Sequence, residues 1–175
     1  MKRGQKYKTR ATRPNSAVHN NVLDVTQDPG HAFVYLRDSS GKIVSILSFG
    51  PGAWIAANLP SFQNGTLPGN ANWPIKGSVS TWESSISPEQ FAAGVKAIAD
   101  FKKNVPNYTI TFQCTTASLS IAQRIGLTLP NGMGPVTALG HNQSVANPYH
   151  LSQQMMKQFG PPQMVGASEF APPKW

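Results

Sequence analysis

The chain contains a single cysteine, Cys114, and its position favours nucleophilic chemistry. Cys114 directly follows a predicted strand over residues 107–113 and precedes a predicted helix over residues 117–125. Backbone N–H groups at the start of a helix stabilise negative charge, so a thiol placed there becomes a better nucleophile towards a carbonyl carbon. The same groups can hold the oxyanion that this attack creates. The alternative is that Cys114 is a small buried side chain in the core.

Other kinds of site find little support in the composition. One cysteine cannot form a disulfide within the chain and does not make a cysteine zinc site. The seven carboxylates are scattered along the chain, so neither a paired-carboxylate glycoside hydrolase nor a carboxylate metal site is expected. The chain has no glycine-rich phosphate-binding loop. We therefore expect no metal and no cofactor.

A thiol nucleophile needs a base, and His31 is the first choice among the four histidines. His31 opens a predicted strand, and rigid strands hold catalytic geometry well. His19 lies in a polar segment, His141 in a predicted loop and His150 in a predicted helix. The alternative for His31 is a surface or capping histidine.

A third residue would orient the imidazole and fix its tautomer. We expect Ser48, because it lies on the neighbouring predicted strand close to the same end as His31. Ser45 points to the opposite face if the strand alternates regularly. His141 and Asn142 are rivals from a loop. The alternative is that Ser48 is an ordinary strand hydroxyl.

Three more residues complete the predicted site. The Gln113 side chain and the backbone N–H groups around Thr115 are expected to stabilise the oxyanion. Trp54 is expected to contact the substrate. Trp73 and Trp82 could line the same groove, although core packing explains each tryptophan equally well.

Sequence patterns predict a chain of short strands and helices around these residues. Capping signals at Ser87, Pro88 and Gln90 mark the start of one helix. The expected elements are a hairpin of residues 31–37 and 43–49 around the turn 38–41, a long loop over 50–75, a strand over 76–82, a helix from 88 to about 103, a strand over 107–113, a helix ending at Gly126, a loop over 127–146 and a helix over 149–159. The predicted fold class is α+β, with an antiparallel sheet packed against the helix that begins near Cys114.

The net charge of +8 is unevenly distributed. Six of the fifteen basic residues lie within the first 13 positions, which leaves the rest of the chain nearly neutral. We therefore expect a basic flexible arm over 1–20, a domain over 21–160 and a proline-rich tail over 161–175. The arm suggests an alternative function, a non-enzymatic module that binds nucleic acid or an anionic surface. No aromatic RNA-binding motif accompanies it, so nucleic acid is the weaker interpretation. The chain shows neither a predicted membrane span nor a secretory signal.

Several short motifs follow one another along the chain, and they are Gly30–Leu36, Ser48–Pro51, Ile86–Gln90, Asn107-Tyr108, Cys114-Thr115, Gly126–Pro130 and Asn147-Pro148. In this order they resemble a circularly permuted papain-like domain of the NlpC/P60 superfamily, of the type found in bacterial toxins and effectors. In that permuted group the histidine strand precedes the cysteine helix, as His31 precedes Cys114 here. Gln113 departs from the pattern, because such toxin domains often carry Asn before the cysteine.

The resemblance implies a papain-like fold and a cysteine peptidase or amidase. Its expected substrates are amide bonds in peptidoglycan stem peptides or in a protein target, and a cognate immunity protein is an expected kind of partner. It also implies synthesis in the cytoplasm without a signal peptide, followed by export through a dedicated secretion system to a target cell or the periplasm. Thiol acyl transfer or lipid hydrolysis on the same residues is a further alternative, because one fold can host several reactions.

Overall fold

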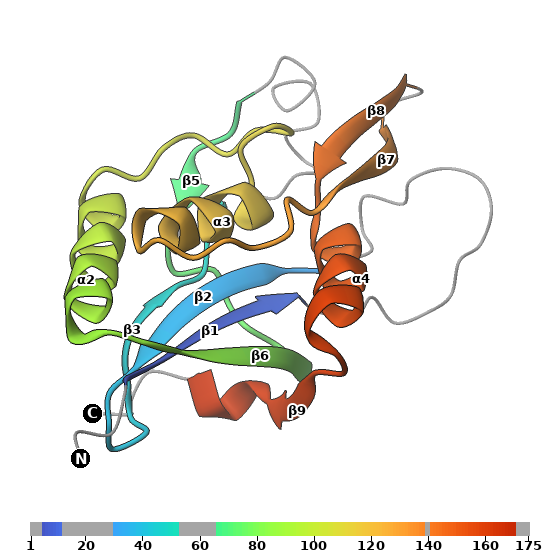
Figure 1. The fold of residues 1–175 in the computed structure, drawn as a ribbon. Helices are drawn as coiled ribbons and strands as arrows, with labels where there is room; N and C mark the ends of the chain where they lie inside the picture. The colour runs from blue at the N-terminus through green and yellow to red at the C-terminus, as the bar shows by residue number, and fades with distance from the viewer. Residues whose placement is uncertain (1–4, 12–29, 53–65, 139–140, 171–175) are drawn as a thin grey trace.

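A computed structural model describes residues 5–11, 30–52, 66–138 and 141–170 of the chain. Its centre is a five-stranded antiparallel sheet with the strand order β3-β2-β1-β6-β9 (Figure 1). The sheet strands are β1 (Gln5–Ala11), β2 (Ala32–Arg37), β3 (Ile43–Leu47), β6 (Ser78–Ile86) and β9 (Gln163–Gly166). Two small two-stranded units accompany it, β4 (Gly50–Pro51) with β5 (Gly69–Asn70) and β7 (Met133–Ala138) with β8 (His141–Ala146).

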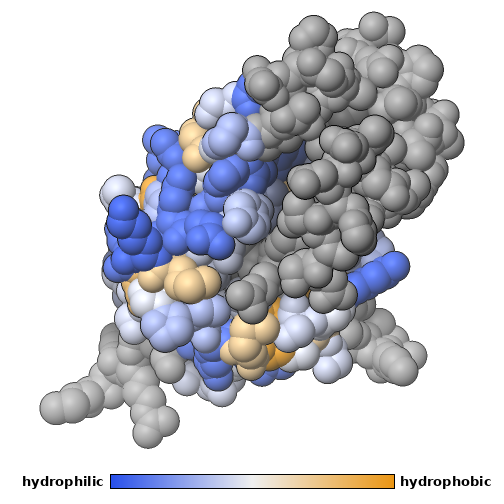
Figure 2. Space-filling view, turned by 90° about the vertical axis from the view of Figure 1, so that its right-hand side faces the viewer, coloured by the Kyte–Doolittle hydropathy of each residue, from blue (hydrophilic) through white to orange (hydrophobic). Residues whose placement is uncertain are grey.

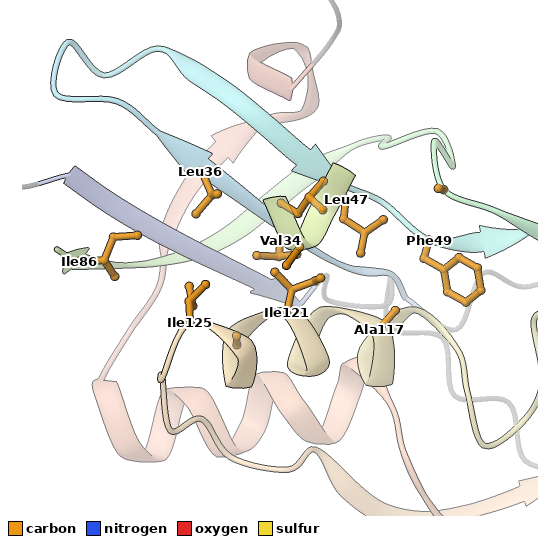
Figure 3. Close-up of a cluster of buried hydrophobic side chains, with 12 residues drawn as sticks. Val34, Leu36, Leu47, Phe49, Ile86, Ala117, Ile121 and Ile125 are labelled. Carbon is orange, nitrogen blue, oxygen red and sulfur yellow. The ribbon is translucent and has the colours of Figure 1, made fainter. Parts of the chain in front are cut away.

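Three helices, α2 (Pro88–Lys103), α3 (Cys114–Arg124) and α4 (Pro148–Phe159), pack on one face of the sheet. The core under α2 and α3 is a cluster of buried aliphatic and aromatic side chains (Figure 3). Within it, Ala117 and Ile121 of α3 lie against Val34 and Leu47 of the sheet. None of the described helices is long and apolar enough to cross a membrane.

The opposite face of the sheet carries a second core. Phe33 and Tyr35 of β2 are fully buried there, and both contact the ring of Phe170. Phe170 belongs to the short 3-10 helix η2 (Ala167–Phe170), which follows β9. Both faces of β2 are therefore covered, which explains its nearly continuous apolar sequence.

Local sequence signals account for the predicted hairpin and for α2. In the turn between β2 and β3, the Asp38 carboxylate accepts hydrogen bonds from Ser40 and from the backbone of Lys42, and Gly41 adopts a φ of 88°. The Ser40 hydroxyl bond holds the pKa of Asp38 below its usual value. Ser87 and Gln90 form the expected capping box at the start of α2.

The predicted strand over residues 107–113 is wrong. Tyr108 makes an isolated bridge to Leu67, and the following residues turn instead of extending. Thr109 closes this turn, because its hydroxyl accepts from the N–H of Phe112 and its own N–H donates to the Phe112 carbonyl. A side-chain hydroxyl thus competes successfully with sheet pairing.

The predicted segment boundaries also change at both ends. Residues 5–11, expected within a flexible basic arm, form β1 between β2 and β6; the rest of residues 1–20 lies outside the described part. Residues 163–170, expected in a proline-rich tail, form β9 and η2. The predicted loop over 127–146 contains the β7–β8 hairpin, and the strand expected over 76–82 is β6 at 78–86. The general α+β class is confirmed.

Candidate active site

Cys114 is the first residue of α3, which begins before the predicted start at residue 117, and it is buried with 4% of its surface exposed. Its side chain belongs to a small core that joins β2, β6 and α4. The members of this core are Ala32, Trp82, Cys114, Leu151 and Met155. The thiol therefore lies at a helix N-terminus that is packed onto the sheet, where backbone N–H groups favour an anion.

Gln113 caps α3. Its backbone is extended, and its side-chain oxygen Oε1 accepts a hydrogen bond of 2.7 Å from the N–H of Thr115. The Cys114 thiol donates to the same oxygen at 3.2 Å, while Nε2 donates to the Ala146 carbonyl at the end of β8. These partners fix which end of the amide is oxygen, because the Thr115 N–H needs an acceptor and the Ala146 carbonyl needs a donor.

This network changes the expected role of Gln113 and Thr115. From the sequence, the Gln113 side chain and the Thr115 N–H are expected to stabilise the oxyanion. In the structure the Gln113 amide nitrogen points to Ala146, and the Thr115 N–H is already bonded to Gln113 Oε1. Gln113 therefore acts as a helix cap and an acceptor for the thiol. The Thr115 hydroxyl is completely buried and has no hydrogen-bond partner among the described residues.

His31 lies immediately before β2, and Ser48 immediately after β3. The two residues are buried, and His31 Nε2 lies 2.7 Å from Ser48 Oγ. Ser48 Oγ also donates to the Trp73 carbonyl at 2.7 Å. The expected histidine–serine pair is thus present as a hydrogen bond.

The bonds of Ser48 determine the tautomer of His31. A hydroxyl has one proton, and Ser48 gives its proton to the Trp73 carbonyl. The short contact to His31 must then run from Nε2–H to Ser48 Oγ. In the neutral ring the lone pair that can accept a proton is consequently on Nδ1. Sequence reasoning found Ser48 but missed the Trp73 carbonyl, because a backbone acceptor leaves no signal in side-chain identity.

Cys114 and His31 lie at the same end of the sheet. α3 runs along β2 in the same direction (Figure 1): Cys114 shares a buried cluster with Ala32 at the start of β2, and Ile125 packs with Leu36 towards its end. Side chains alternate along the strand, however, and the His31 ring stacks on Phe33, on the face away from α3. The His31 ring therefore lies at the start of β2 on the Phe33 side, and the next residue, Ala32, is the one that packs with Cys114.

A cleft of about 350 Å³ lies between α3 and the β7–β8 hairpin. It is lined by Thr116 and Ser120 of α3 and by Ser144 and Ala146 of β8. Ala146 also accepts the hydrogen bond of Gln113, so the cleft borders the cap of the Cys114 helix. Figure 2 shows the side of the molecule that carries α4 and this hairpin, where hydrophilic residues cover most of the described surface.

The remaining candidates have structural contacts or lie outside the described part of the chain. His150 contacts the Pro135 carbonyl of β7, and the Trp82 indole donates to the Gly160 carbonyl, so both have structural roles. Trp54, His19 and the side chains of His141 and Asn142 lie outside the described residues. Among the described residues, no cluster of three or more His, Cys, Asp or Glu could hold a metal ion.

Comparison of the chain with protein-family models, with curated proteins and with solved structures gives no match. The functional argument therefore depends on the residues and their geometry.

Proposed function

We propose that this protein is a cysteine hydrolase that cleaves amide bonds, with Cys114 as the nucleophile and His31 as the base. The observation that carries the proposal is the hydrogen bond from His31 Nε2 to Ser48, which leaves the basic lone pair on Nδ1. A histidine held in one tautomer, at the end of the sheet where a helix begins with a thiol, is the arrangement that thiol hydrolysis requires. A papain-like fold of the permuted NlpC/P60 type is part of this proposal.

The reaction proceeds in two steps. His31 Nδ1 takes the thiol proton while Cys114 Sγ bonds to the carbonyl carbon, whose π electrons move onto oxygen. The C–N bond then breaks, Nδ1 returns the proton to the leaving amine, and a thioester remains on Cys114. Water attacks this thioester and gives a proton to Nδ1; the C–S bond breaks, the carboxylic product leaves, and the proton returns to Sγ.

Gln113 sets the resting state of the nucleophile in this scheme. The neutral thiol donates to Gln113 Oε1, whereas a thiolate would face that partially negative oxygen. Proton transfer to His31 is therefore coupled to release of the thiol from Gln113.

The cleft next to the cap of α3 supports a peptide as substrate. Six of its ten lining residues carry an uncharged hydroxyl or amide group, which can bond the N–H and C=O groups of a peptide backbone, and the other four are apolar. The substrate class that we propose is a peptidoglycan stem peptide or a protein segment, and the setting that follows is a bacterial toxin or secreted effector.

Labelling with iodoacetamide tests the pair directly. Cys114 of the folded protein should react near neutral pH, and His31→Ala should slow the reaction by about tenfold or more because the proton acceptor is lost. His150→Ala is the matched control, since that ring contacts the Pro135 carbonyl, and it should leave the rate unchanged. Reaction of Cys114 only after denaturation would refute the proposal.

A second assay addresses the bond that is cleaved. The full chain is incubated with a muropeptide mixture and, separately, with a denatured protein, and the products are analysed by mass spectrometry. New amino and carboxyl ends should appear with the wild type and be absent with Cys114→Ala. Equal product with both proteins would exclude Cys114 as the nucleophile.

A further inference from the structure

A large cavity lies beside β3, away from the Cys114 helix. It is a groove of about 810 Å³, which is within the range of ligand-binding pockets. One wall comes from α2, and the other comes from Ile75 and η2. The side chains that line it are mostly apolar, including Ile43, Ile46 and Ile98.

The backbone beside this groove has room for one more strand. β3 is at the edge of the five-stranded sheet, and no described strand pairs with its outer side over Ile43–Leu47. An exposed strand edge offers N–H and C=O groups to an added peptide. Apolar walls above and below the edge would bury both sets of alternating side chains of that peptide.

The space beside β3 is closed at one end. Asn72 forms a parallel bridge with Ser48, and the Trp73 N–H donates to the Ser48 carbonyl at 2.8 Å. A strand added along Ile43–Leu47 therefore meets Asn72 and Trp73 and cannot continue in the same line. A peptide whose chain ends at this point fits the groove better than one that runs through it.

A cation lies at the closed end. Lys102 of α2 lines the groove, and its ammonium donates to the Asn72 side-chain oxygen at 2.9 Å. Among the described residues, no carboxylate lies within ion-pair distance of Lys102. Partial burial lowers the pKa of Lys102, so an anion beside the ammonium would offset a desolvation cost.

We propose that this groove binds the carboxyl-terminal residues of a partner protein as an added strand parallel to β3, with the terminal carboxylate at Lys102. The parallel direction follows from the position of Lys102, which is next to Ser48 at the carboxyl end of β3. The last residues of the partner are apolar, in keeping with the walls. Binding does not depend on hydrolysis by Cys114, so the proposal stands apart from the proposed function.

Fluorescence anisotropy with a defined peptide pool tests the proposal on the full chain carrying Cys114→Ala. The probe is a pool of amino-terminally labelled hexapeptides with Val, Ile, Leu or Ala at the last four positions and a free terminal carboxylate. The same pool with an amidated terminus should bind about tenfold or more weakly, because a charge-assisted hydrogen bond is lost. An amidated pool with an internal Glu should also bind weakly.

Variants of two neighbouring lysines provide the matched control. Lys102→Met should weaken binding of the acid pool to the level of the amide pool, and Lys102→Arg should retain most of it. Lys103→Met removes the same charge from an exposed position on α2 and should change little. Amide chemical shifts of Ile43–Leu47 should move upon binding of the acid pool.

Each contrary result overturns the proposal. These results are equal binding of the acid and amide pools, equal effects of the two Met variants, tight binding of the internal Glu pool, shifts confined to other elements, or no saturable binding at millimolar peptide. A thermal melt of each variant confirms that it is folded. If Lys102→Met does not fold, Lys102→Arg keeps the test valid.

Discussion

At the scale of single residues, the clearest chemical information is the direction of hydrogen bonds around His31. Ser48 cannot donate to both the Trp73 carbonyl and His31, so the proton on the imidazole is assigned by its neighbours. The serine therefore positions the His31 ring, and in the proposed reaction it would act through the histidine.

Replacement of Ser48 by Ala should therefore change the tautomer of the His31 ring while leaving the Cys114 side chain itself in place. Nitrogen-15 shifts of His31 at high pH should show the Nε2–H tautomer in the wild type and a mixture of tautomers in Ser48→Ala. Labelling of Cys114 should slow by about three- to tenfold, as expected for loss of one hydrogen bond. Ser45→Ala, a change within β3 on the same segment as Ser48, is the control. An unchanged tautomer in Ser48→Ala would contradict the assignment.

Gln113 gives a second prediction with two separable parts. Gln113→Ala removes the cap of α3 and should lower the free energy of unfolding by about 0.5–2 kcal/mol, measured in urea. Gln113→Glu places a carboxylate beside the thiol, which opposes the thiolate, so the pH profile of labelling should move to higher pH. Gln123→Ala, at an exposed position near the end of the same helix, should do neither. A pH profile of Gln113→Glu that matches the wild type would rule out the contact with the thiol.

At the scale of elements, the segment around Trp73 supports both Ser48 and the closed end of the groove. Gly50 allows the Trp73 ring to lie close to the backbone, because a Cβ atom at position 50 would overlap this ring. Trp73 is held there by its backbone bond to Ser48 and by this close approach.

Gly50→Ala should therefore displace Trp73 and lower the free energy of unfolding by about 1–3 kcal/mol, as overpacking does. The same variant should weaken the orientation of His31, because Ser48 loses its carbonyl acceptor. Gly166→Ala is a matched change in β9, where a Cβ meets only an ordinary contact. Equal urea midpoints for the two variants would show that the Trp73 ring can move at no cost.

Local signals explain which elements the sequence predicted correctly. The signals for the β2–β3 turn and for the Ser87 cap each lie within a few neighbouring residues. The alternating positions of Tyr108 and Phe112 led to the wrong prediction of a strand. Both rings pack against Phe49, so apolar residues alternate along this segment although it is not a strand. Long-range packing of this kind has no local signature.

At the scale of the whole molecule, β1 is the element that differs most from the prediction. Its polar and basic sequence gives no apolar alternation, and its place between β2 and β6 depends on residues far along the chain. Residues 1–20 were expected to be a flexible arm that could bind nucleic acid. Gln5–Ala11 form a central strand instead, so that interpretation does not hold for these residues. The partners of Ser48 and Gln113 were similarly hidden, since both are backbone carbonyls of distant segments.

A proline scan distinguishes a central strand from a solvated arm. Thr9→Pro removes an N–H donor from a strand that pairs on both sides, so it should abolish cooperative unfolding or lower its midpoint sharply. Val44→Pro, in the edge strand β3, should be tolerated better because β3 pairs on one side among the described strands. If Thr9→Pro left the midpoint of unfolding unchanged, the interpretation of residues 5–11 as part of a flexible arm would be restored.

The strand order has a consequence for how the protein is made. Residues up to Ile86 supply β1, β2, β3 and β6, together with His31, Ser48 and Trp73, and all of them leave the ribosome before Cys114. Cys114 therefore joins strands that can already be paired. It emerges after Ala32 and Trp82, the two sheet residues that pack with it, and before Leu151 and Met155 of α4, which complete this core.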